Sequence, residues 1–407
     1  MGVYCDYLST LEIAANHPLT ITNYATLLYH GAYSGKLSPR RLLIVDEAHR
    51  SEDILMGFIS VEISRRSLNA YIPTGGVVSW ELPKLKMAAE VLRWLKDEIE
   101  PRLPSAEGAA LRGTNFGNAA YGRHAARRFT FLRNLGSKIE ELEEALAGEE
   151  EWVVDPSRLP DFLVIKPVTV SRYGPKIFRF GQKVVLFSGT ILDPYVMAES
   201  LGIPEDRCSF IDVPSTFPLE NRPFIHRFVG AMTRRDMERT KPLLLEEVKS
   251  IAEFHGDEKG VVHTHTFDLA QDVMGILGDR AMTHSSGNRE EVLGAFIADQ
   301  NPRILVSPSM TDGLDLPGDL GRWQILAKTP YPYLGDPQVR RRAEIDPDWY
   351  SWRTCVTVAQ VPGRIVRGPD DWGVTYFLDS STERVVNENA SILPASFMDA
   401  WNAALIA

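Results

Sequence analysis

The stretch RRLLIVDEAHR, residues 40–50, joins a run of apolar side chains to a short acidic segment. The apolar run from Leu42 to Val45 is typical of a strand buried in a parallel sheet. Asp46 and Glu47 follow directly, so the pattern places them at the carboxyl end of that strand. A carboxylate there can hold Mg²⁺ through water, and its neighbour can orient and deprotonate an attacking water.

This pattern is typical of the second nucleotide-binding motif of motor ATPases, in which His49 would couple the nucleotide to the rest of the motor. The alternative is a chance tetrapeptide at a strand end, where acidic residues are common. Such a motif normally works with a phosphate-binding loop upstream. The sequence contains no Gly-Lys followed by Ser or Thr, since Gly35 and Lys36 precede Leu37. The 407 residues therefore lack both the backbone nest and the lysine that a P-loop gives to phosphates.

The composition is that of an ordinary globular protein, with 44% hydrophobic and 24% charged residues. We find no apolar run of about 18 residues and no signal-peptide pattern, so we expect no membrane association. The three scattered cysteines are too few for a disulfide scaffold, which favours the cytoplasm. The net charge of −10 argues against a purely electrostatic nucleic-acid binder, but not against a locally basic DNA track.

Strand and helix patterns alternate over much of the chain, which predicts an α/β fold with a parallel sheet and helices on both faces. Residues 60–165 differ, because their apolar residues recur at helical spacing among many charges, and they predict a mostly helical insertion. The proline-rich stretch from Pro204 to Pro223 predicts a link between two α/β lobes. Elsewhere we predict strands at 183–190, 259–266, 302–309, 323–330 and 373–379, and helices at 242–256 and 267–277.

Two short polar motifs follow predicted strands. Ser188 to Thr190 can relay the nucleotide state between lobes, although an ordinary turn with a helix cap explains the same residues. In SPSMTDGLDLPG, Gly313 permits a tight turn, and Asp312 and Asp315 flank it. These carboxylates can contact ribose, magnesium-bound water or arginines, and the alternative is a solvated acidic turn.

The segment QVPGRIVR, residues 360–367, carries two arginines. Gln360, Arg364 and Arg367 would share one face of a helix, and two arginines presented together can grip a γ-phosphate. The alternative is a basic helix face that makes salt bridges. Pro362 fits the first turn of a helix but not its interior, so we predict that a helix begins near Val361.

The order and spacing of these motifs resemble the XPD/DinG family of superfamily 2 DNA helicases. The resemblance covers nearly the whole chain but is weak in residues 60–165. The matching stretches are CDYLSTLEIAANHPLTITNYATLLY (5–29), LLIVDEAHRSEDIL (42–55), VVLFSGTILDP (184–194), STFPLENRPF (215–224), THSSGNREEVLGAF (283–296), ILVSPSMTDGLDLPG (304–318) and QVPGRIVRGPDDWGVTYFLD (360–379).

The resemblance implies two RecA-like lobes of the P-loop-NTPase type that sandwich ATP, with the first lobe incomplete. Residues 1–59 and 166–218 would form the first lobe. Residues 60–165 would be an arch-like helical insertion, and residues 219–407 would form the second, helicase C-terminal lobe.

The resemblance also implies roles for individual residues. Asp46 would serve Mg²⁺, Glu47 would be the hydrolytic base, and Arg364 and Arg367 would reach the phosphates. The nucleotide cleft would further include His49, Asp312, Gly313, Asp315, Gln360 and Gly363. The DNA backbone would meet Thr264, Thr266, Ser285 and Ser286. Asp312 stands where the family usually has Glu, which is a conservative difference.

Cys5 lies before Asn23-Tyr24, in a context that resembles the fourth ligand of the iron–sulfur cluster found in some family members. A single thiolate cannot hold a four-cysteine cluster, so a cluster would need upstream cysteines. The alternative is a free thiol near a terminus.

The resemblance thus implies an ATP-dependent helicase, using ATP and Mg²⁺, that moves 5′ to 3′ on single-stranded DNA. It would need a P-loop from an upstream segment or a separate chain. The alternative is a non-catalytic DNA-binding or regulatory remnant. A nuclease ranks last, because we find no convincing carboxylate and histidine cluster outside these motifs. We also expect a poorly closed first lobe, because a parallel sheet without its opening strands leaves an unpaired edge.

Overall fold

The computed structural model describes residues 6–33, 35–72, 86–114, 119–285, 287–309 and 314–406. It separates into two compact units. The first unit comprises Met1–Phe187, Ala198–Cys208 and Tyr333–Pro347, and the second comprises Ser188–Met197, Ser209–Pro332 and Asp348–Ala407. None of the helices in the described ranges has the length and apolar character needed to cross a bilayer.

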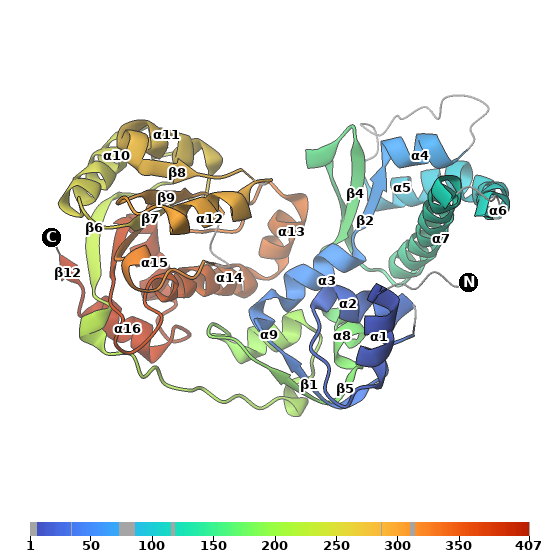
Figure 1. The fold of residues 1–407 in the computed structure, drawn as a ribbon, viewed down its shortest axis with the longest axis horizontal. Coiled ribbons are helices and arrows are strands. Elements are labelled where there is room, and N and C mark those ends of the chain that lie inside the picture. Colours follow the sequence, from blue (N-terminus) through green and yellow to red (C-terminus); the bar gives the residue numbers. More distant parts are fainter. Residues whose placement is uncertain are drawn as a thin grey trace. The chain divides into compact units, whose positions relative to one another are not determined.

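The first unit contains a small parallel sheet of two strands, β1 (Arg40–Val45) and β5 (Gly181–Leu186), drawn in Figure 1. Ile44 pairs with Val185 in the register, and these side chains are 63% and 47% exposed. Leu42 and Phe187 lie on the same face and are also exposed. This unit also contains the helices α1 (Asp6–Asn16), α2 (Tyr24–Leu28), α3 (Ser51–Ile59) and α8 (Pro175–Phe178). The residues of α9 (Pro194–Ser200) are divided between the two units.

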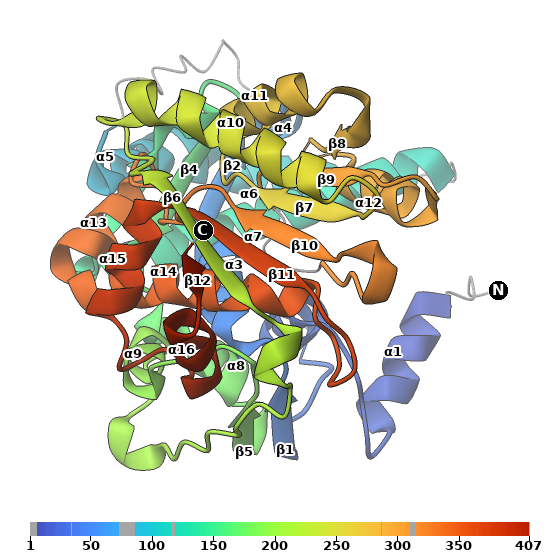
Figure 2. The same cartoon turned by 90° about the vertical axis from the view of Figure 1, so that its left-hand side faces the viewer.

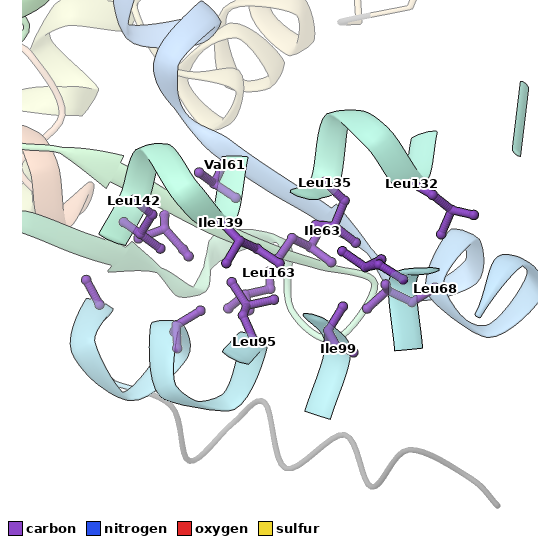
Figure 3. Packing of buried hydrophobic residues seen from close by; sticks show 14 of the residues in the cluster. Val61, Ile63, Leu68, Leu95, Ile99, Leu132, Leu135, Ile139, Leu142 and Leu163 are labelled. Atoms are coloured by element: carbon purple, nitrogen blue, oxygen red, sulfur yellow. The ribbon is translucent and has the colours of Figure 1, made fainter. Parts of the chain in front are cut away.

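A helical layer on an antiparallel sheet follows α3 in the first unit. The sheet has the order β2-β4-β3, and leucine, isoleucine and valine side chains fill its interface with the helices (Figure 3). The helical spacing of residues 60–165 indicated the helices but not these strands, because each strand is only four to six residues long. The elements are β2 (Val61–Ser64), α4 (Arg65–Tyr71), α5 (Ala88–Trp94), α6 (Leu103–Thr114), α7 (Ala119–Ala147), β3 (Trp152–Asp155) and β4 (Phe162–Pro167).

Helix α13 (Pro337–Ile345) comes late in the sequence but packs in the first unit. The Lys166 ammonium lies 2.6 Å from an Asp155 oxygen and 2.7 Å from an oxygen of Asp336, the N-cap of α13. The Gln338 amide also donates to the Val168 carbonyl at 2.8 Å. Polar contacts thus attach this helix to β3, β4 and the segment after β4.

The second unit is built on a seven-stranded parallel sheet with the order β12-β6-β11-β10-β7-β9-β8 (Figure 2). Every residue of the neighbouring strands β10, β7 and β9 is buried, as expected for strands covered on both faces. The strands are β6 (Phe224–Gly230), β7 (Gly260–His263), β8 (Ala281–Thr283), β9 (Ile304–Ser307), β10 (Trp323–Leu326), β11 (Val374–Asp379) and β12 (Leu405–Ile406).

Helices cover both faces of this sheet. Side chains of α10 and α11 pack on one face with Ile325 and Tyr376, and those of α14, α15 and α16 pack on the other with Leu326 and Phe377. The α/β class predicted from the sequence, with its parallel sheet, is confirmed. The helices are α10 (Met237–Phe254), α11 (Phe267–Leu277), α12 (Arg289–Ala298), α14 (Pro347–Gln360), α15 (Ser380–Glu388) and α16 (Ala395–Asn402).

Candidate functional site

The acidic segment begins where β1 ends. One Asp46 carboxylate oxygen accepts a hydrogen bond from the Glu47 backbone N–H at 2.8 Å. Glu47 adopts a left-handed backbone conformation, with φ of 49° and ψ of 47°. This region disfavours residues with a side chain, and such strain is often found at functional sites.

Backbone hydrogen bonds fix this turn to the end of β5. The Phe187 N–H donates to the Val45 carbonyl, and the Ala48 N–H donates to the Phe187 carbonyl, both at 2.9 Å. The Tyr24 hydroxyl lies 3.2 Å from the Asp46 carbonyl and 3.0 Å from the Ser51 hydroxyl. Burial raises the pKa of Tyr24 above its ordinary value, and the Ser51 hydrogen bond opposes that rise. The tyrosine therefore stays protonated and can donate to the Asp46 carbonyl.

The carboxylates of the turn are open to solvent, whereas His49 is 5% exposed. Its Nδ1 atom lies 3.4 Å from a Glu47 carboxylate oxygen. A pocket of about 500 Å³ beside Glu47 is lined in part by the rings of Tyr24, Tyr29 and Phe58. The described ranges contain no group of three or more histidine, cysteine, aspartate or glutamate residues that could hold a metal ion alone. One carboxylate completed by phosphate oxygens and water still suits Mg²⁺, which usually keeps several waters.

The arginine segment differs from the predicted helix. Helix α14 ends at Gln360, and a short 3₁₀ helix occupies Pro362–Arg364. Arg367 lies beyond it in irregular structure, so Gln360, Arg364 and Arg367 do not share one helical face. A helix does begin at the predicted place, because the 3₁₀ helix has Val361 as its N-cap and Pro362 in its first turn, but it ends at Arg364 and is too short to carry the predicted face. Pro362 has no backbone N–H and clashes with the preceding turn, so α14 stops before it.

Within the second unit, the Ser188 to Thr190 motif meets Gln360. The Gln360 amide donates to the Thr190 hydroxyl at 3.0 Å, and Thr190 is buried. The Trp352 indole N–H donates to the Ile191 carbonyl at 2.8 Å. Two motifs that the sequence separates by about 170 residues are thus neighbours in space.

The described part of the Gly-Asp turn pairs with the arginine segment. The Arg367 Nε atom lies 2.6 Å from an Asp315 carboxylate oxygen, and its Nη1 donates to the Gly363 carbonyl at 2.9 Å. The Leu316 N–H donates to the Arg364 carbonyl at 3.1 Å. The Arg364 guanidinium lies 3.5 Å from the Gln360 side-chain oxygen. Asp315, Gln360, Gly363 and both arginines therefore form one group.

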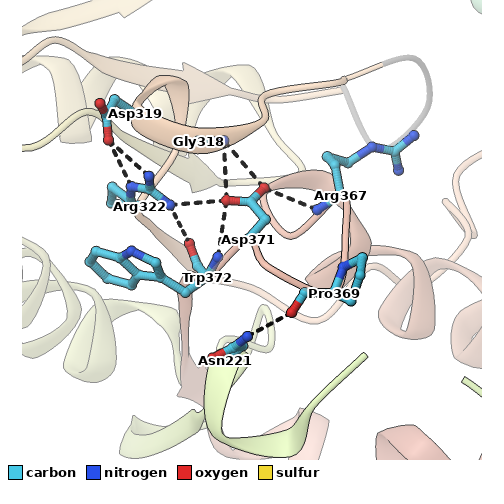
Figure 4. A network of polar contacts seen from close by, with 8 residues as sticks. All are labelled: Asn221, Gly318, Asp319, Arg322, Arg367, Pro369, Asp371 and Trp372. Carbon is cyan, nitrogen blue, oxygen red and sulfur yellow. Dashed lines mark hydrogen bonds and ion pairs between the residues drawn. The ribbon is translucent and has the colours of Figure 1, made fainter. Parts of the chain in front are cut away.

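The sequence patterns missed Asp371, which lies next to this group (Figure 4). Its carboxylate accepts backbone hydrogen bonds from Gly318, Arg367 and Trp372 and contacts the Arg322 guanidinium. The only signal in the sequence is an acidic pair, Asp370-Asp371, shortly after the second arginine. No residue spacing distinguishes it from a solvated loop.

A buried polar pair lies beneath the arginine segment. The His263 Nε2 atom is 3.2 Å from the Gln324 side-chain oxygen, and the Gln324 amide donates to the Val361 carbonyl at 2.9 Å. Burial lowers the pKa of His263 to about 4, the nearby Arg364 charge adds to the fall, and the Gln324 hydrogen bond opposes it. The imidazole is therefore neutral near pH 7 and donates to Gln324.

The predicted DNA contacts lie at or just beyond the carboxyl ends of β7 and β8. Thr264 is fully buried and its hydroxyl donates to the Thr266 carbonyl at 3.1 Å. Thr266 caps α11 by accepting from the Leu269 N–H. Ser285 is exposed, and its hydroxyl lies 2.8 Å from the Asn288 side-chain oxygen. Ser285 thus has the most accessible side chain of these three.

Four predicted site residues lie outside the described ranges: Cys5, Ser286, Asp312 and Gly313. Cys208 is an exposed free thiol and Cys355 a buried one. Burial raises the pKa of Cys355 to about 12, so that thiol is protonated and unreactive at neutral pH.

Residues 257–399 match the helicase C-terminal domain family. The structure of S. tokodaii Xpd4 is similar to the chain with a TM-score of 0.53 and 17% identity, over 90% of this chain and 79% of that one. An apo XPD structure gives a TM-score of 0.55 at 16% identity, with the same two coverages. An XPD helicase structure gives 0.56 at 14% identity, over 94% of this chain and 71% of that one. No curated protein matches the sequence.

These findings define the fold of the chain. It has a RecA-like α/β fold similar to that of the solved XPD structures. Residues 257–399 are similar to the helicase C-terminal domain family.

Proposed function

We propose that the chain is an ATP-dependent DNA helicase that moves 5′ to 3′ on single-stranded DNA in the cytoplasm. The observation that carries the proposal is the group formed by Asp315, Gln360, Arg364 and Arg367 inside the helicase C-terminal domain. Two arginines beside an acidic turn are the kind of residues with which a motor ATPase binds the γ-phosphate. The direction of movement rests on the resemblance to XPD-like helicases alone.

In this proposal, the acidic turn supplies the hydrolytic chemistry. Glu47 would accept a proton from the attacking water, and its exposed carboxylate on a fixed turn suits that role. Asp46 would hold Mg²⁺, and the metal would neutralise charge on the phosphates when bound. The buried His49 would keep the Glu47 side chain oriented. The motor would still need a P-loop from a separate chain or an upstream segment, because the sequence contains none.

Arg364 and Arg367 would stabilise charge on the transferred phosphoryl group. An arginine supplied to this position contributes roughly 10³–10⁵ in kcat in other phosphoryl-transfer enzymes. Arg367 contacts Asp315 in this structure, so phosphate would have to exchange with that carboxylate. Ser285, Ser286, Thr264 and Thr266 are the proposed contacts to the DNA backbone.

The experiment is single-stranded-DNA-stimulated ATP hydrolysis by the purified chain, with Glu47→Gln as its control. Hydrolysis that Glu47→Gln abolishes would support a motor that grips phosphate without a recognisable P-loop. If the chain alone is silent, the assay is repeated with a P-loop-bearing chain from the same source. Glu47→Gln should then bind ATP yet lose roughly 10²–10⁴ in turnover. Unchanged turnover in that variant would remove Glu47 from its role.

A non-catalytic DNA-binding or regulatory protein is the second candidate, and the missing Gly-Lys-Ser/Thr motif favours it for the chain alone. The retention of Glu47, Arg364 and Arg367 together favours the motor. DNA binding with no hydrolysis, even when a P-loop-bearing chain is added, would select this second candidate.

A further inference from the structure

Asp371 lies in the loop between the 3₁₀ helix at Pro362–Arg364 and strand β11, and its side chain is only 13% exposed. The Gly318 N–H lies 3.2 Å from each of its oxygens, and the Arg367 N–H lies 3.1 Å from one of them. The Trp372 N–H and the Arg322 guanidinium each donate to it at 3.0 Å. Figure 4 shows these donors converging on one carboxylate.

This carboxylate joins two segments that carry the arginine group. Gly318 ends the turn that begins with Asp315, and Arg367 is the second arginine. The two segments are also joined by the hydrogen bond from the Leu316 N–H to the Arg364 carbonyl and by the Arg367–Asp315 ion pair. The Asp371 carboxylate differs from these two contacts because it accepts hydrogen bonds from backbone amides of both segments, those of Gly318 and Arg367.

The donors around Asp371 require a negatively charged side chain. Burial acts to raise the pKa of Asp371, but the amides of Gly318, Arg367 and Trp372 and the Arg322 charge bring it below its ordinary value. A carboxylate that accepts several N–H bonds is held in its charged form. An asparagine would place one NH₂ group among donors, and at least one amide would lose its acceptor.

Arg322 provides a comparison within the same cluster. It contacts Asp371 through Nη1, and it contacts Asp319 through Nε at 3.0 Å and Nη2 at 2.9 Å. The Asp319 side chain is 97% exposed, and its carboxylate contacts Arg322. Asp319 therefore shares one partner with Asp371 but holds no backbone amide of the arginine segment.

The geometry points to Asp371 as a positioning residue that sets where Arg364 and Arg367 present their guanidinium groups to an anionic ligand. The ligand class, the phosphates of a nucleoside triphosphate, rests on the proposed function. The positioning itself rests only on the contacts of Asp371 and is tested without nucleotide.

The first test compares Asp371→Asn with Asp319→Asn in the full chain. Both variants replace a carboxylate that contacts Arg322 with an isosteric amide. We measure amide hydrogen exchange in peptides covering residues 314–318 and 364–372, and the Arg367 Nε–H signal by NMR with labelled arginine. Asp371→Asn should raise exchange in both peptides at least about tenfold and shift the Arg367 signal, because the amides lose their acceptor. Asp319→Asn should change neither.

Unchanged protection in Asp371→Asn, or an equal loss in Asp319→Asn, would overturn the proposal. Protection of the distant strand β7 reports whether the variant still folds. If Asp371→Asn unfolds the unit, Asp371→Glu replaces it, since it keeps the charge and moves it by one methylene. That variant should retain β7 protection and recover part of the Arg367 signal, and a signal identical to the unperturbed chain would contradict positioning.

The second test uses inorganic triphosphate as the probe and measures its binding by calorimetry. Asp371→Asn should weaken binding by about tenfold and Asp319→Asn by less than about twofold, because only the former displaces the arginines. Equal weakening in both would overturn the proposal. If the unmodified chain alone does not bind triphosphate, the titration is repeated with the P-loop-bearing chain. No binding in that mixture contradicts the proposed function, and the exchange measurement alone then decides the role of Asp371.

Discussion

The two parallel sheets of this chain carry the two halves of the candidate chemistry in very different surroundings. Strand β1, which ends at Asp46, has one partner strand in the described residues and a face on which Ile44 is 63% exposed. Strand β10, in the unit that carries the arginines, lies between two strands and is buried throughout. Parallel strands are stable when both faces are covered, so the first sheet is the weaker support.

The comparison shows that the sequence of a strand and its environment can be mismatched. LLIV in β1 is as apolar as ILV in β9, yet Leu42 and Ile44 are exposed while Ile304 and Leu305 are fully buried. An apolar run therefore indicates that a strand is stable only when its side chains are buried, but it does not show that they are buried. The four predictions below test this contrast, beginning with the largest expected effect.

The rate of amide hydrogen exchange should show the largest difference between the two sheets. We expect the amides of Leu43 to Val45 in β1 to exchange roughly a thousandfold faster than those of Leu305 to Ser307 in β9, because a two-stranded sheet opens locally. Mass spectrometry of peptic peptides measures both in one experiment. Equal protection, or one sharp cooperative melt of the whole chain as a monomer, would contradict a poorly closed first sheet.

Matched truncations of isoleucine should differ between the sheets. Ile325→Ala removes a fully buried side chain from the larger sheet and should cost about 2–5 kcal/mol of unfolding free energy. Ile44→Ala removes a largely exposed one and should cost less than about 1 kcal/mol. Urea unfolding followed by circular dichroism measures both. Similar costs would show that the face of β1 is covered in solution.

Acid should weaken the larger sheet through His263. The pKa of His263 is about 4 in the folded chain and 6.5 in the reference state, so the unfolded chain binds more protons between these values. Stability is then full above pH 6.5 and falls toward pH 4, by up to about 1.4 kcal/mol per pH unit. The slope of urea-unfolding free energy against pH measures this. His263→Asn should flatten the slope, and an unaltered slope would assign the effect to other groups.

A polar substitution of the same shape should have the smallest effect. Val185→Thr on the exposed face of β5 should change stability by less than about 0.5 kcal/mol and reduce binding of a hydrophobic dye. The control Val262→Thr places a hydroxyl in the buried strand β7 and should cost about 1–3 kcal/mol. A large cost for Val185→Thr would mean that this face is packed in solution.

The candidate site was predictable to the extent that its chemistry is local. The acidic turn follows its strand as expected, because the end of the apolar run is enough to predict the position of Asp46 and Glu47. The expected position of Arg367 on a helical face was wrong, because the short 3₁₀ helix that begins at Pro362 already ends at Arg364. Asp371 had no usable signal, because its proposed role depends on the Gly318 amide, which lies about 50 residues away in the sequence.

The sequence by itself determined the α/β class, the order of the motifs, strands β7, β9, β10 and β11 of the larger sheet, and helices α10 and α11. These follow from periodicity and from residues that act on their immediate neighbours. Only the tertiary structure decided the strand order, the attachment of α13 to the first unit, and the contacts of Thr190 with Gln360 and of Arg367 with Asp315. Such contacts depend on how crossover connections bring distant segments together, and that information is spread over the whole chain.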